Sequence, residues 1–112
     1  MLENDKPILI YTTLSSESDA RQLGRALIER GLAACVNILP GMTSIFRWDG
    51  ELQQEREVVM IVKSRAKLTQ PLLAAAEELH PYETPALLVI PISEAATGFT
   101  SWITAQTTAD DS

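Results

Sequence analysis

The spacing of apolar residues along this chain alternates between the two-residue period of strands and the 3.6-residue period of helices. Runs rich in aliphatic and β-branched residues predict strands over residues 7–13, 32–48, 51–63 and 86–92. Between them, apolar residues at helical spacing predict helices that begin at Ser16, near residues 68–70 and shortly before Phe99. The predicted order is therefore strand, helix, strand, strand, helix, strand and a last short helix.

Turn-forming residues fix where these elements bend or end. Pro40-Gly41 interrupts the second strand, because proline cannot donate to the ladder, and predicts a bulge or bend. Asp49-Gly50 is a strong signal for a two-residue hairpin turn. Pro81 requires the second helix to end by His80, and Pro91 predicts that the last strand lies at a sheet edge.

This order of elements predicts an α+β fold of the ferredoxin-like βαββαβ type, with an antiparallel sheet, both crossover helices on one face and an extra C-terminal helix. At 112 residues, the chain is predicted to be a single domain, 1–112. We expect residues 1–6 and 107–112 to fray, because the tail is small, polar and acidic.

The predicted strands are apolar on both of their sides. Val58, Met60 and Val62 point one way, while Val59 and Ile61 point the other. An antiparallel sheet with helices on one face and water on the other should instead alternate apolar with polar residues. We therefore expect a second copy of the chain to cover the second face in a closed oligomer.

Composition and charge exclude several classes of protein. The chain has 46% hydrophobic and 21% charged residues and a net charge of −6, without a cluster of Lys and Arg, so no nucleic-acid partner is expected. No apolar run is long enough to span a membrane, and the N-terminus has no secretory pattern. These features predict a cytoplasmic protein, and the single cysteine excludes an intrachain disulfide.

Few residues offer metal or nucleophile chemistry, because the chain has one cysteine and one histidine. Cys35 lies among small apolar residues and is interpreted as a packing residue. His80 is either a capping residue bonded to the last carbonyls of its helix or a metal ligand. One imidazole cannot make a tight site alone, so symmetry copies or nearby carboxylates would have to complete it.

Tyr82 and Glu83 lie in a loop held between Pro81 and Pro85, where they would either bind a small polar ligand or make a subunit contact. Lys63 ends an apolar run and is either a snorkelling lysine or a partner of an acid or anionic ligand. The phosphate-binding, redox and serine-hydrolase motifs are absent from the sequence. We therefore expect no enzymatic activity and no organic cofactor.

Short blocks in a fixed order resemble the CutA divalent-cation-tolerance family from about residue 8 to residue 102. The blocks are Ala33-Ala34-Cys35-Val36-Asn37-Ile38, Pro40-Gly41, Ser44-Ile45-Phe46-Arg47-Trp48-Asp49-Gly50, Glu57, Lys63, His80-Pro81-Tyr82-Glu83, Pro85 and Trp102. The resemblance implies a ferredoxin-like subunit in a tight homotrimer, similar in architecture to the PII signalling proteins. It also implies a cytoplasmic protein linked to tolerance of copper and other divalent cations.

The resemblance extends only in part to a metal site. Copper-binding members of the family are described with a cysteine at the end of the first strand and a His-His pair before Pro-Tyr. The matching positions here are Tyr11, Leu79 and His80, so only the second histidine is present.

Two functional hypotheses follow from this sequence. The first is a homotrimer in the response to divalent cations, copper above all, with weak or indirect metal binding through His80. The alternative is a PII-like sensor that binds a small anion or nucleotide in clefts between subunits, lined by Lys63, Tyr82 and Glu83.

Overall fold

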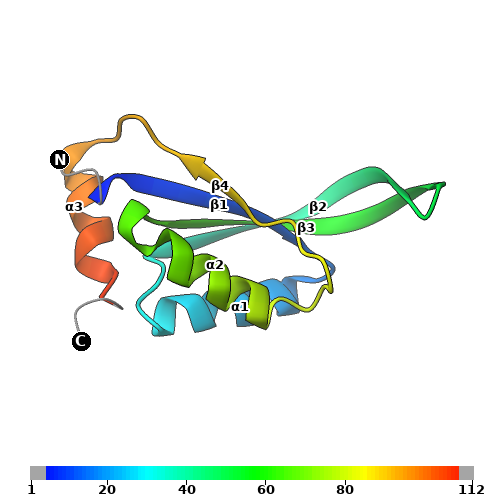
Figure 1. Cartoon of the computed structure of the whole chain (residues 1–112), viewed down its shortest axis with the longest axis horizontal. Coiled ribbons are helices and arrows are strands. Elements are labelled where there is room, and N and C mark those ends of the chain that lie inside the picture. The colour runs from blue at the N-terminus through cyan, green and yellow to red at the C-terminus, as the bar shows by residue number, and fades with distance from the viewer. Residues whose placement is uncertain (1–4, 109–112) are drawn as a thin grey trace.

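Four strands form one antiparallel sheet in the computed structural model, which describes residues 5–108. The elements are β1 (Pro7–Leu14), α1 (Glu17–Glu29), β2 (Cys35–Trp48), β3 (Glu51–Arg65), a short 3₁₀ helix η2 (Ala66–Leu68), α2 (Thr69–Leu79), β4 (Leu88–Pro91) and α3 (Thr97–Gln106). The strand order is β2-β3-β1-β4, which is that of the ferredoxin-like fold. Figure 1 shows α1 and α2 side by side on one face, α3 at one end of the sheet and the β2–β3 hairpin projecting beyond the other.

The predicted order of elements is confirmed, and the edge position of the last strand with it. Two strands are shorter than expected: β2 begins at Cys35 rather than at residue 32, and β4 covers only Leu88–Pro91, against the 86–92 expected from the sequence. Ladder pairing with β1 is limited to the four partners of Ile8 through Tyr11, so the apolar residues before Leu88 lie in the loop that leads into the strand. The helices of the described residues 5–108 are all too short or too polar to cross a membrane.

Local chemistry explains how α1 begins and ends. The Ser16 hydroxyl accepts a hydrogen bond from the Asp19 backbone N–H at 3.1 Å, which caps the helix. Gly31, directly after the helix, has φ +73°, a left-handed conformation that an L-residue rarely adopts. The chain therefore turns sharply from α1 toward β2.

The projecting hairpin has the turn and the bulge that its sequence predicts. Asp49 and Gly50 have φ values of +51° and +79°, as a two-residue type I′ turn requires. The β2–β3 register shifts between Leu39 and Met42, and Gly41 there has φ +85°. This bulge bends the hairpin where it leaves the body of the sheet.

The hydrophobic core lies between the sheet and the two helices. Its centre on β3 is formed by Val58, Met60 and Val62, which are 7%, 0% and 1% exposed. Gly24 of α1 lies so close to the sheet that a Cβ there would be 2.7 Å from Val36 Cγ2. The remaining core comes from β1, α1 and α2 and includes Ile8, Ile10, Leu14, Leu23, Leu27 and Leu72.

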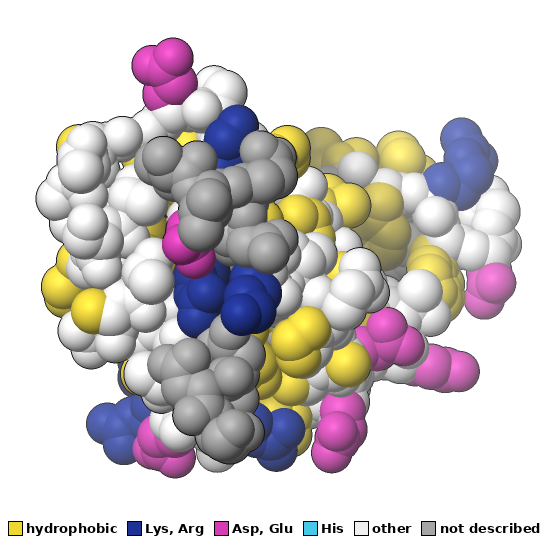
Figure 2. Space-filling model, turned by 60° about the vertical axis from the view of Figure 1, so that its left-hand side comes forward, with side chains coloured by type: hydrophobic (Ala, Val, Ile, Leu, Met, Phe, Trp, Pro, Cys, Tyr) yellow, Lys and Arg dark blue, Asp and Glu magenta, His cyan; other side chains and the backbone are white. Residues whose placement is uncertain are grey.

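The other face of the sheet carries a largely apolar surface that no element among residues 5–108 covers fully. Two rows cross the strands, in which paired residues lie opposite each other in the register: Lys63, Leu9 and Ile90, then Ile61, Tyr11 and Leu88. Lys63 is the one charged residue of these rows. Leu88 and Ile90 are 57% and 42% exposed. In Figure 2, hydrophobic side chains reach the surface over the middle of the molecule and on toward the receding hairpin.

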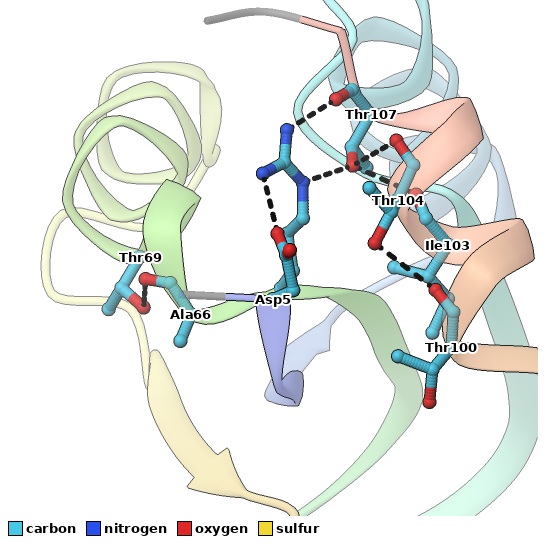
Figure 3. Close-up of polar contacts among 8 residues, drawn as sticks. Asp5, Ala66, Thr69, Thr100, Ile103, Thr104 and Thr107 are labelled. Atoms are coloured by element: carbon cyan, nitrogen blue, oxygen red, sulfur yellow. Dashed lines mark hydrogen bonds and ion pairs between the residues drawn. The ribbon is translucent and has the colours of Figure 1, made fainter. Parts of the chain in front are cut away.

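Arg65, at the end of β3, joins the first and last described segments of the chain. Its Nε donates to Thr107 Oγ1 and its Nη2 to the Thr107 carbonyl, both at 2.8 Å, and its Nη1 lies 3.3 Å from Asp5 Oδ1 (Figure 3). Thr107 is fully buried, so the expected fraying does not begin there. The expectation for residues 1–4 and 109–112 lies outside the described residues.

Candidate functional site

The candidate site lies where the loop after α2 passes the base of the projecting hairpin. His80, the residue directly after α2, is only 6% exposed. Its Nε2 lies 2.9 Å from the Thr13 carbonyl oxygen and 3.1 Å from Thr12 Oγ1. Its Nδ1 accepts a hydrogen bond from the Tyr82 backbone N–H at 3.1 Å. The imidazole thus connects the end of β1 to the loop.

These partners assign the tautomer of His80. Because Nδ1 accepts from an N–H, the proton of the neutral ring is on Nε2, where it is donated to the Thr13 carbonyl oxygen. Burial lowers the pKa of His80, and the bond to Thr13 opposes this effect only in part. The expected bond to the helix carbonyls is wrong, because the ring reaches β1 instead, and both ring nitrogens are engaged.

Tyr82 extends this network to the hairpin by donating its hydroxyl to Glu57 Oε2 at 2.8 Å. Burial and this bond raise the pKa of Tyr82 well above its usual value. Burial acts to raise the pKa of Glu57, but hydrogen bonds from Ser44, Tyr82 and Thr13 together outweigh it and lower the pKa. The Glu57 carboxylate is therefore ionised at neutral pH.

A pocket of about 450 Å³ opens beside this network. Three aromatic rings and three carboxylates line it, from the hairpin and from the loop: Phe46, Trp48, Tyr82, Glu55, Glu57 and Glu83. Its walls bring together Tyr82 and Glu83, which the sequence predicted as lining, with hairpin residues that were not assigned to a site.

Lys63, the third predicted lining residue, lies elsewhere in the chain. Its Nζ is 5.5 Å from the centre of the Phe99 ring, over α3. Lys63 and Glu57 are six positions apart on β3, which corresponds to roughly 20 Å along a strand. Within one chain, therefore, Lys63 does not share a pocket with Tyr82; it would do so only across a subunit boundary.

The residues around His80 do not assemble a metal site. Among the described residues 5–108, no three His, Cys, Asp or Glu side chains are grouped to hold a metal ion. Tyr11 instead donates its hydroxyl to Met42 Sδ at 3.5 Å, and Leu79 packs against the core. A metal at His80 would have to displace one of the hydrogen bonds of the ring.

Three other residues of interest are only partly enclosed. Cys35 is half-buried at the start of β2, opposite Lys63 in the ladder. Trp48 and Trp102, which as large aromatic residues are expected to fill the core or an interface, are 60% and 42% exposed. They do not fill the core of this subunit, whereas an interface role stays a prediction.

The hairpin residues of the pocket carried a signal that sequence analysis could have used. Phe46 and Trp48 alternate along β2, and Glu55 and Glu57 along β3, so each pair points to one side of its strand. Once the Asp49-Gly50 turn fixes the register, both pairs fall on the same face. The position of the loop that closes the pocket depends on tertiary packing.

The fold and site define a class: a small ferredoxin-like α+β domain with a projecting hairpin and, among the described residues, no group of three side chains placed to hold a metal ion. The family model described as CutA1 divalent ion tolerance protein matches residues 8–106. The chain therefore belongs to the CutA1 divalent ion tolerance family. This confirms the resemblance on which the sequence analysis relied.

Individual relatives agree with this family. The divalent-cation tolerance protein CutA of Pectobacterium atrosepticum is 39% identical over 91% of this chain and 96% of its own length. The CutA1 crystal structure from Ehrlichia chaffeensis matches with a TM-score of 0.88 and 32% identity, over 91% of this chain and 95% of that one. The structure of the Archaeoglobus fulgidus CutA, described as periplasmic, matches with a TM-score of 0.86 and 35% identity, over 90% and 98%.

Proposed function

We propose that this chain acts in the cytoplasm as a homotrimer in the cellular response to divalent cations, copper above all, and that it is not an enzyme. Family membership supports the link to divalent cations. The observation that carries the trimer is the uncovered apolar face of the sheet. Partners are thus other copies of the chain and the cations themselves, with no nucleic acid and no membrane.

The uncovered face supports self-association on energetic grounds. Completing the burial of a half-exposed aliphatic side chain contributes on the order of 1 kcal/mol. Leu88 and Ile90 are of this kind, and Leu9 and Ile61, which are partly buried, lie next to them in the register. A closed ring of identical subunits covers such a face on every copy.

Sedimentation velocity tests the assembly. Ile61→Lys places a charge in the middle of this face, and we expect it to convert a trimer into monomers. Gln70→Lys adds the same charge on the exposed surface of α2 and should leave the trimer intact. A wild-type protein that sediments as a monomer, or an Ile61→Lys protein that stays trimeric, would contradict the proposal.

We further propose that direct binding of Cu²⁺ is weak. His80 is the only imidazole of the chain, and binding through it must break a hydrogen bond to Tyr82 or Thr13. Leaving such a buried group unpaired costs about 1–3 kcal/mol, which lowers the affinity of any site built there.

Calorimetric titration of the assembled protein with Cu²⁺ at pH 7, beside His80→Ala, measures this directly. We expect weak binding in the wild type and less in the variant. Circular dichroism checks that the variant is folded. Tight saturable binding that survives in His80→Ala would contradict a role for this residue.

A PII-like sensor is the second candidate. Because Lys63 and Tyr82 lie far apart within one chain, a cleft lined by both would have to form between two subunits. In an oligomer, Lys63 of one subunit can approach the Tyr82–Glu83 loop of the next, which would form a cleft for a small anion or nucleotide. ATP titrated against wild type and Lys63→Ala tests this role. Binding that depends on Lys63 and is indifferent to His80→Ala would favour the sensor over the cation response.

The cytoplasmic location is tested by fractionation of cells that produce the full chain. We expect the protein with the cytosolic marker. Recovery in the periplasmic fraction would instead match the description of the Archaeoglobus fulgidus relative.

A further inference from the structure

The pocket at the base of the hairpin combines two kinds of side chain that together recognise one class of ligand. Phe46, Trp48 and Tyr82 supply aromatic rings, and Glu55, Glu57 and Glu83 supply carboxylates. No lysine or arginine is among the described residues that line it. The walls thus carry negative charge and the electron-rich faces of rings, and both attract cations.

The charge of Glu57, one of the three lining carboxylates, is fixed by the hydrogen-bond network behind it. The Tyr82 hydroxyl donates to Glu57 Oε2 at 2.8 Å, which favours the ionised form of that carboxyl. His80 is neutral and holds the loop in place through the Thr13 carbonyl oxygen and the Tyr82 N–H. Since the charge is held in place before a ligand arrives, the pocket is preorganised for a positive group.

The volume of the pocket and the arrangement of its three carboxylates determine which kind of cation fits. Its volume of about 450 Å³ falls in the range of small-molecule sites, ~300–1,000 Å³. The three carboxylates are not grouped as metal ligands, since the described part of the chain contains no such group of three. The lining therefore suits a cation that is large, weakly hydrated and able to contact rings.

We propose that this pocket binds a small organic ammonium ion, with its charged nitrogen among the carboxylates and its alkyl groups against Trp48 and Phe46. An anion is disfavoured by the same carboxylates. A neutral molecule of the same shape gains the apolar contacts but neither the charge attraction nor the cation–π interaction. This site is separate from His80 as a metal ligand, and it uses residues of a single chain.

Choline and its neutral carbon isostere, 3,3-dimethylbutan-1-ol, are the matched probes. Both are titrated calorimetrically into the full-length protein, at an ionic strength held constant with NaCl. We expect choline to bind saturably and the isostere at least about tenfold more weakly, because only choline carries charge. Equal binding of the two, or no binding of choline, would overturn the proposal.

Three variants locate the binding. Trp48→Leu removes the most exposed ring and Glu57→Gln removes the carboxylate that Tyr82 holds, and each should weaken choline binding about tenfold. Glu55→Gln, an isosteric change at an exposed residue, gives a second charge variant that is expected to fold normally. Trp102→Leu and Glu51→Gln change the same residue types outside the pocket lining and should leave the affinity unchanged.

The choline titrations test the ammonium site separately from the Cu²⁺ titration, which tests the metal role. If Trp48→Leu and Trp102→Leu weaken choline binding equally, the ligand is not in this pocket and the proposal fails. If choline binds as expected while Cu²⁺ gives no heat, the ammonium site stands and only the metal role falls.

Discussion

The two ends of the sheet differ in what their buried polar side chains contact. At the end near the termini, the Arg65 side chain is 5% exposed and binds Thr107 and Asp5. At the hairpin end, the buried His80 is likewise fully engaged, but it holds a network that ends at Glu57, beside an open pocket. The charge of Arg65 is enclosed by partners of the same chain, whereas the charge of Glu57 lies at the wall of an open pocket.

This difference separates a structural cluster from a binding site. At the termini, the donors of Arg65 point at partners of the same chain, so the cluster contributes stability. At the hairpin end, the interior groups position Tyr82 and Glu57, and three carboxylates line an open pocket. We therefore expect changes at the first end to affect stability and changes at the second to affect binding.

The largest loss of stability is expected for Arg65→Met. It removes two hydrogen bonds to Thr107 and the pair with Asp5, with an expected cost on the order of 3 kcal/mol. Urea unfolding at fixed protein concentration measures it. Arg21→Met, which removes an exposed pair with Glu17, should cost less than about 0.5 kcal/mol, and equal losses would remove the contrast between buried and exposed arginine.

His80→Ala should cost less, on the order of 2 kcal/mol, because it leaves the Thr13 carbonyl and the Tyr82 N–H without their partner. The same unfolding experiment measures it. A change below about 0.5 kcal/mol would show that the imidazole does not hold the loop.

The pH dependence of stability isolates the charge state of His80. Burial lowers its folded pKa below the ordinary value of 6.5, so below that pH the unfolded state binds more protons than the folded state. The contribution is complete above pH 6.5 and decreases as the pH falls through it. Unfolding midpoints at pH 7.5 and 5.5 should show this decrease in the wild type and a smaller one in His80→Ala; identical slopes would refute it.

Tyr82→Phe should cost about 1 kcal/mol, since it removes a single hydrogen bond to a carboxylate. Because the hydroxyl helps to lower the pKa of Glu57, that pKa should rise in the variant. Carboxyl ¹³C chemical shifts followed through a pH titration measure both proteins. An unchanged Glu57 titration would mean that the other donors fix its charge.

The smallest effect is expected for Glu55→Gln. Glu55 is exposed on the hairpin and lines the pocket, so its loss should change stability by less than about 0.5 kcal/mol. A larger loss in urea unfolding would place Glu55 among the structural residues and blur the contrast between the two ends.

Sequence reasoning predicted the fold because each element carried a local signal. Ser16 capped α1, Asp49-Gly50 formed the hairpin turn, and the bulge fell at Pro40-Gly41. It did less well with the ends of elements: β4 is shorter than its apolar run, because strand length depends on pairing with β1. Thr107, expected to fray, is held by Arg65, a partner 42 positions away in the chain.

The candidate site was predictable only in part. Tyr82 and Glu83 were named because prolines flank them, and both line the pocket. Lys63 was named with them but lies over Phe99, since nothing local to a strand end reveals which side chain meets it. The hairpin residues of the pocket were missed because their alternation gains meaning only when a loop faces them.

The sequence by itself determined the order of the elements, the turns between them, the apolar character of both sheet faces and the family. These are encoded by residues close together in the chain, through periodicity, capping and backbone conformation. Only the tertiary structure decided that His80 is engaged at both nitrogens, that Arg65 binds Asp5 and Thr107 and that carboxylates and rings meet around one pocket. Such features depend on side chains brought together from distant strands and loops, and no local pattern specifies which of them will meet.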